Sequence, residues 1–173
     1  MKKIIAIVCA AVLCLSMAAC GSKPASSTPA SSTQQLTAKP ETELGKAMLK
    51  EFGDKIASGK EYTAESLAEE LAASETLPFM GASMPVEEGF LNGFSDEIKG
   101  FKEGAMFGPM IGSIPCIGYV FTVENAADVA AFEATLKEKA DLRWNICTAA
   151  DEMVCDHLGS TVFFLMCPAQ FEE

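Results

Sequence analysis

The sequence predicts an α+β domain, in which a small antiparallel sheet of about three strands is packed with helices. Apolar residues in the first part of the domain recur at three- and four-residue steps, as they do on one face of a helix. Later segments are short and rich in β-branched and aromatic residues, as strands are. Of all residues, 49% are apolar and 21% are charged, which is typical of a globular chain.

The N-terminus has the features of a secretory signal peptide. Two lysines precede an apolar run from Ile4 to Leu15, and small residues follow it. Two alanines directly before Cys20 and a glycine after it resemble the lipobox of bacterial lipoproteins, in which the cysteine thiol receives diacylglycerol. We therefore predict a lipoprotein signal peptide over residues 1–19 and lipidation at Cys20. The alternative is an ordinary cleaved signal with an incidental cysteine.

Residues 20–42 are predicted to be a flexible linker of Ser, Thr, Pro and Ala that follows the lipidated cysteine. The pentapeptide Pro24–Thr28 is repeated as Pro29–Thr33, and Leu36 is the single large aliphatic residue. Such a segment buries too little apolar surface to offset its ordering entropy. Two acyl chains attach a protein stably to a bilayer. We therefore expect membrane lipid as a partner through acylated Cys20, on the outer, extracytoplasmic face of the cell membrane.

Residues 43–173 are predicted to form a single α+β domain, which begins with helices. A stripe of apolar residues from Leu44 to Ile56 predicts a first helix that ends near Gly59. Thr63 is a favourable N-cap for a second helix.

The middle of the domain carries weaker signals. Two prolines and several glycines between Thr76 and Gly93 predict irregular structure. Ser95 followed by two acids predicts another helix start, and Ile98, Phe101 and Ala105 would share one face of that helix.

The second half predicts the sheet. Cys116–Val123 has the composition of a strand, and Asn125 is expected to cap a helix that runs to about residue 140. Glu152–Leu158 and Thr161–Cys167 flank Gly-Ser, a two-residue hairpin signal. These elements predict the spatial order first-third-second. The last strand, apolar on both faces, should be central, and the strand before it should be an edge.

Several of these features together resemble a known group of proteins. Besides the lipobox and polar stalk, they are a Gly-aromatic turn in Asn92–Ile98, the pair Pro109-Met110, a strand feeding a long charged helix over Ile117–Trp144, and a closing hairpin. The chain is similar, over about residues 43 to 167, to short lipoproteins of clostridia and related Gram-positive bacteria that carry a domain of unknown function. The resemblance implies no activity and no catalytic residue.

Four cysteines remain in the domain. In an exported protein they suggest disulfides. The predicted topology places Cys116 beside Cys167 at one end of the sheet, and Cys147 lies near enough to compete for either. The alternative is that all four, Cys155 included, are small core residues. No CxxC or HxxxH spacing supports a metal site, and we predict neither a metal nor another cofactor.

The sequence predicts a non-enzymatic binding or interaction module of the bacterial cell envelope with an unidentified protein partner. The formal net charge of −11 argues against nucleic-acid binding. A methionine-rich segment, Phe79–Met84, together with Met106 and Met110, could line an adaptable binding surface. One alternative is a ligand-binding lipoprotein associated with a transporter. The other is a thiol-dependent enzyme that uses Cys155 and His157, which would share one face of a strand.

Overall fold

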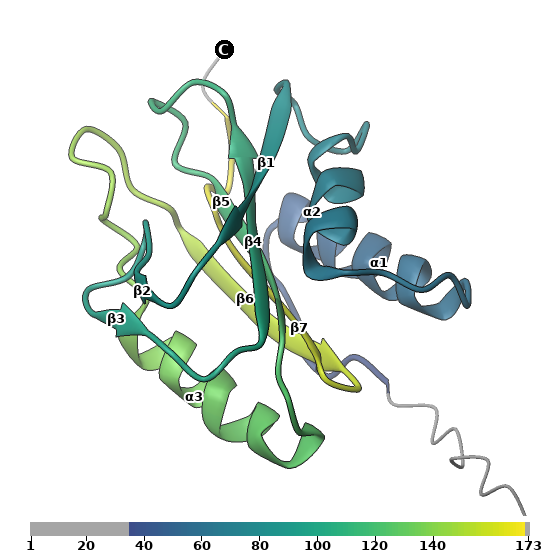
Figure 1. Ribbon diagram of the computed structural model, residues 1–173. Helices are drawn as coiled ribbons and strands as arrows, with labels where there is room; N and C mark the ends of the chain where they lie inside the picture. Colours follow the sequence, from purple (N-terminus) through teal and green to yellow (C-terminus); the bar gives the residue numbers. More distant parts are fainter. Residues whose placement is uncertain (1–34, 172–173) are drawn as a thin grey trace, which may run out of the picture. The chain divides into compact units, whose positions relative to one another are not determined.

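The structure, a computed structural model, describes residues 35–171 and has helices on both faces of an antiparallel sheet (Figure 1). In this part of the chain the helices are α1 (Glu43–Ala57), α2 (Ala64–Ala72) and α3 (Val129–Lys139), with a 3-10 turn, η1 (Ala126–Asp128), before α3. The strands are β1 (Gly81–Val86), β2 (Gly89–Phe90), β3 (Glu97–Ile98), β4 (Glu103–Pro109), β5 (Ile117–Thr122), β6 (Glu152–Leu158) and β7 (Thr161–Cys167).

The predicted sheet of about three strands is wrong. The α+β class is right, but the main sheet has five strands in the order β1-β4-β5-β7-β6, and β2 pairs with β3 in a separate two-stranded sheet. The last three strands keep the predicted order within the larger sheet, with β7 between β5 and β6. The error lies in β1 and β4, which add two strands beyond β5.

Strand β1 falls in the segment that we expected to be irregular because of its prolines and glycines. Proline removes a backbone donor, but an edge strand tolerates it where its nitrogen faces away from the sheet. Strand β1 is such an edge strand, and it carries Pro85 opposite Ala105 of β4. The proline that predicted irregular structure therefore lies in an edge strand.

Strand β4 overlaps the helix that we predicted from Ser95. The expected apolar stripe is divided in the structure: Ile98 and Phe101 pack on the α3 side of the sheet, whereas Ala105 is buried on the α1 and α2 side. Gly100, with φ at 98°, adopts a conformation that a helix does not allow.

Two hydrophobic cores lie on opposite faces of the sheet. One core contains Phe52 of α1, Leu67 of α2 and Phe163 of β7, and the other contains Phe132 of α3 and Phe164 of β7. The N-terminal helices therefore cover one face and α3 covers the other (Figure 1).

The helix starts confirm one cap and correct another. The hydroxyl of Thr63 accepts the Ser66 amide at 3.1 Å and forms a capping box. Asn125 makes no capping hydrogen bond, and its side chain donates to Asp128 instead.

A short segment before α1, Leu36–Thr42, lies along the domain, and we call it the strap. The Asp156 carboxylate accepts the amides of Thr37 and Ala38 at 2.5 and 2.8 Å. The Glu152 carboxylate accepts the amides of Glu41 and Thr42 at 2.5 and 2.9 Å. Two acids of β6 thus fasten the chain where it enters the domain, so residues 36–42, which we predicted to belong to the flexible linker, pack on the domain instead.

The close packing of β4 on β5 gives a first prediction. A Cβ on Gly118 would lie 2.1 Å from the Phe107 ring, so Gly118→Ala should lower the free energy of unfolding by about 1–3 kcal/mol. Urea denaturation of the full chain measures this loss. Gly112→Ala is the control, because no atom lies within 4 Å of that Cβ. Equal stability of the two variants would contradict the described packing.

The strap gives a second prediction. Burial alone would raise the pKa of Glu152, but hydrogen bonds from the Thr42 hydroxyl and from the amides of Glu41 and Thr42 outweigh it, so this pKa lies below its ordinary value of 4.5. A carboxyl group with a depressed pKa stabilises the folded state at pH values above its ordinary, unfolded-state pKa. This stabilisation is lost as the pH falls through the folded-state pKa. Glu152→Gln should cost about 1–2 kcal/mol at pH 7 and less in acid.

Thermal unfolding of both proteins from pH 7 to pH 3 measures this difference. Glu61→Gln, a change of an exposed acid between α1 and α2, serves as the control. A stability deficit of Glu152→Gln that does not shrink in acid would refute the role assigned to the carboxylate.

Candidate functional site

Large exposed apolar side chains gather around β1. Of six such side chains among the described residues, five lie on or next to β1, β2 and the end of β4. They are Met80, Met84, Phe90, Met110 and Ile111. Met80 is 79% exposed and Met84 is 52% exposed. Exposed apolar patches on a soluble domain mark sites of interaction more often than single exposed residues do.

The β1–β4 register arranges methionines in pairs. Met84 lies opposite Met106, and the Met110 amide donates to the Met80 carbonyl at 3.3 Å. The small pair Ala82 and Gly108 lies between them. Because side chains alternate along a strand, the side chains of the four methionines and Ala82 project from one face of the sheet, and Gly108 lies between them on that face. We call this set (Met80, Ala82, Met84, Met106, Gly108 and Met110) the methionine surface.

The methionine surface lies on the same face of the sheet as α3 but away from it. Val86 and Met106, which share its parity, pack against the core on the α3 side. Helix α3 packs mainly on β6 and β7, at the other end of the sheet. The face of β1 and β4 is therefore left to solvent at Met80, Met84 and Met110.

Cys116 and Cys167 come together as the sequence predicts. Ile117 pairs with Met166, which places Cys116 opposite Cys167, and both belong to the core on the α1 side. The Val123 amide donates to the Ser160 carbonyl, so this opposed pair is a hydrogen-bonded one. Bonded and non-bonded pairs alternate along antiparallel strands, and Cys116 lies seven residues before Val123, so the Cys116–Cys167 pair is a non-hydrogen-bonded one. Cα atoms there are about 4.5 Å apart, within disulfide range. All four described cysteines are free thiols in the structure, and the disulfide stays a prediction.

Cys147 differs from that pair in its exposure. It is exposed in the loop between α3 and β6, while the other three described cysteines are buried. Together with loops around Phe79, Ile114 and Phe171, it lines a pocket of about 620 Å³.

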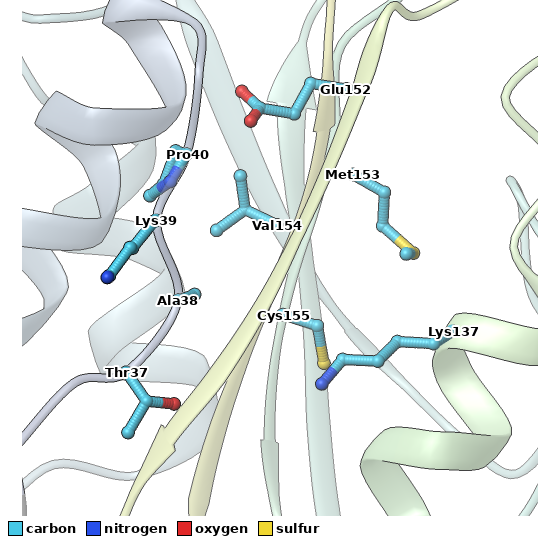
Figure 2. A pocket seen from close by; sticks show the side chains of 9 residues that line it. All are labelled: Thr37, Ala38, Lys39, Pro40, Lys137, Glu152, Met153, Val154 and Cys155. Atoms are coloured by element: carbon cyan, nitrogen blue, oxygen red, sulfur yellow. The ribbon is translucent and has the colours of Figure 1, made fainter.

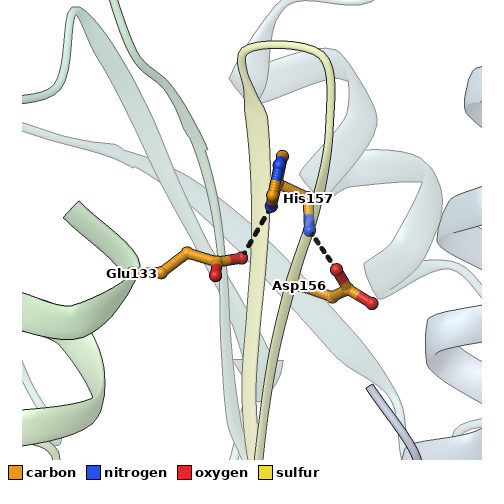
Figure 3. Close-up of side chains that lie close together, drawn as sticks. All are labelled: Glu133, Asp156 and His157. Atoms are coloured by element: carbon orange, nitrogen blue, oxygen red, sulfur yellow. Dashed lines mark hydrogen bonds and ion pairs between the residues drawn. The ribbon is translucent and has the colours of Figure 1, made fainter. Parts of the chain in front are cut away.

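The structure does not support a nucleophile at Cys155. Burial raises the pKa of this thiol to about 12, so it is protonated at neutral pH. His157 Nδ1 contacts Glu133 Oε1 of α3 at 3.0 Å (Figure 3). A carboxylate on another element therefore engages the histidine, and no sequence pattern signals this contact.

Glu133, Asp156 and His157 each offer one potential metal-ligand atom, and these atoms lie within 4.8 Å of one another. Asp156, however, already accepts the His157 amide with one oxygen and the strap amides with the other. Figure 3 shows Asp156 and Glu133 on opposite sides of β6. The group is thus accounted for as a hydrogen-bonded connection between α3, β6 and the strap.

A smaller pocket of about 240 Å³ lies at the edge of β6. Figure 2 shows the strap residues on one side of β6, with Cys155 and Lys137 on the other. The pocket therefore straddles the edge strand.

Comparison of the chain with protein-family models, curated proteins and solved structures finds no match in any of the three. The resemblance to clostridial-type lipoproteins therefore stays a prediction. Cys20, the predicted lipidation site, lies outside the described residues. No helix within residues 35–171 is both long and apolar enough to cross a bilayer.

The cysteine environments predict the order of thiol labelling. Among the four described cysteines, Cys147 should react with a maleimide first under native, reducing conditions, because the other three are buried. Peptide mapping by mass spectrometry follows these four positions, and Cys147→Ser removes the fast phase among them as a control. Labelling of Cys155 as fast as Cys147 would show that the thiol is exposed and would reopen the thiol-enzyme alternative.

Proposed function

We propose that this chain is a membrane-anchored extracytoplasmic lipoprotein whose acidic domain binds a protein of the cell envelope without catalysing a reaction. The observation that carries the proposal is the gathering of exposed apolar side chains around β1. Methionines suit such a surface because their flexible, polarizable side chains adapt to a partner.

The anchor in this proposal rests on the sequence. Two acyl chains on Cys20 would hold the protein at the membrane, with the predicted linker up to the strap as a spacer. The domain has no need to bind lipid itself, and the whole chain, with a formal net charge of −11, would be repelled by anionic headgroups. The protein surface is thereby free to engage a partner.

A ligand-binding lipoprotein associated with a transporter is the second candidate. The pocket beside Cys147, about 620 Å³, has a volume typical of small-molecule sites. We place this function second because it leaves the exposed methionines around β1 without a role.

Photocrosslinking in intact cells tests the proposal. A photoreactive amino acid at Ala82, in the floor of the methionine surface, should give one reproducible crosslinked protein that mass spectrometry identifies. The matched position is Lys50, on the exposed side of α1. Met80→Ser combined with Met84→Ser should abolish most of the product, because the apolar contact area is lost.

Two outcomes would contradict the proposal. One is the same product from Ala82 and Lys50, which would mean that the surface confers no selectivity. The other is an undiminished product from the double methionine variant at an unchanged level of the protein.

A further inference from the structure

We infer that the free edge of β1 binds an extended segment of a basic partner protein, which adds to the sheet as a sixth strand. The inference rests on the proposed function and names its mode of recognition. In this mode the main chain supplies hydrogen bonds, and side chains on the two faces of the new strand supply selectivity.

The hydrogen bond from Met110 to Met80 fixes which groups of β1 face outward. In an antiparallel pair, bonded and non-bonded positions alternate. Residues 80, 82, 84 and 86 therefore turn their backbone groups toward β4, whereas Gly81, Ser83 and Pro85 turn theirs away from the sheet. The backbone groups that face outward are the amides of Gly81 and Ser83 and the carbonyls of Gly81, Ser83 and Pro85. No other described strand pairs with this edge.

The two faces of β1 differ in chemistry. One face continues into the methionine surface, which would receive apolar side chains of the added strand. The other face borders a pocket of about 360 Å³ that is lined by Glu65 of α2, Glu103 of β4 and Pro85 of β1. A lysine or arginine of the added strand would place its charge between these two carboxylates.

Charge selects the partner. Both pocket acids are exposed, as are Glu87 and Glu88 directly after β1, and the whole chain has a net charge of −11. A second copy of this chain would bring the same carboxylates against one another, which like-charge repulsion opposes. A partner segment that combines alternating apolar residues with Lys or Arg would fit both faces of β1. Its apolar side chains would contact the methionine surface, and its basic side chain would contact the acidic pocket.

Synthetic peptides and the full chain in mild detergent test the inference. The probe is a blocked octapeptide in which valine and threonine alternate over six residues and two arginines follow. A second probe carries the arginines first, because the strand direction is not fixed, and control peptides carry two glutamates instead. Fluorescence anisotropy should show saturable binding of one arginine peptide that weakens with salt, and none of the glutamate peptides.

Two protein variants separate the edge from the pocket. Ser83→Pro removes an outward amide at a position equivalent to Pro85, so the bonds to β4 stay intact. It should weaken peptide binding roughly tenfold, and Ser83→Ala should not. Glu65→Gln with Glu103→Gln should weaken binding by a similar factor and reduce its salt dependence.

A peptide-side test needs no folded variant. The arginine peptide is N-methylated either on all valines or on all threonines, and only one of these sets faces β1 in an added strand. One methylated peptide should lose binding and the other should keep it. Equal binding of both, or no saturable binding of either arginine peptide, overturns the inference.

Failure of the inference leaves a distinct signature from failure of the proposed function. If crosslinking from Ala82 still depends on the methionines while the peptides do not bind, the partner uses the surface without adding a strand. Concentration-dependent dimerisation of the chain that Ser83→Pro abolishes would instead assign the edge to a second copy and overturn the basic segment.

Discussion

Burial of β7 on both of its faces is the constraint on which the fold depends. Every residue from Val162 to Cys167 is buried, so successive side chains must enter two separate cores. The Phe163 ring stacks on Phe52 of α1 with centroids 5.2 Å apart, while Phe164 packs against Phe94 at 4.9 Å on the other face. A strand of this kind needs a neighbour on each edge and a cover on each face, and β5, β6 and the helices supply them.

This constraint explains which parts of the fold the sequence could predict. The hairpin of β6 and β7 is encoded locally by apolar runs around a Gly-Ser turn, and β5 has a β-branched and aromatic pattern of its own. Strand β4 contains Gly104 and Gly108, which are not typical strand residues. The glycine at position 104 is needed because the neighbouring strand lies close: a Cβ there would lie 3.0 Å from the Phe121 ring. Such requirements arise from the assembled sheet, so a local pattern does not reveal them.

The candidate site divides in the same way. The methionines were visible in the sequence as a cluster of one residue type, but only the β1–β4 register pairs Met84 with Met106 on one face. Cys116 and Cys167 could be placed together because the order of the last three strands was predictable. The contact between Glu133 and His157 depends on how α3 lies on β6, and the acidic pocket depends on a strand that was expected to be a loop. Both features depend on contacts between residues that lie far apart in the sequence.

The two edges of the sheet are treated differently. At β6, Asp156 and Glu152 accept four strap amides, and Asp156 also accepts the outward amide of His157. At β1, Pro85 blocks a single position. Natural sheets protect free edges against pairing. The edge of β1 instead leaves backbone donors beside exposed apolar side chains, so a requirement other than protection against pairing must explain it. Four strand spacings, about 19 Å in all, separate the two edges. The strap therefore holds the chain at one edge while the opposite edge stays accessible to a partner.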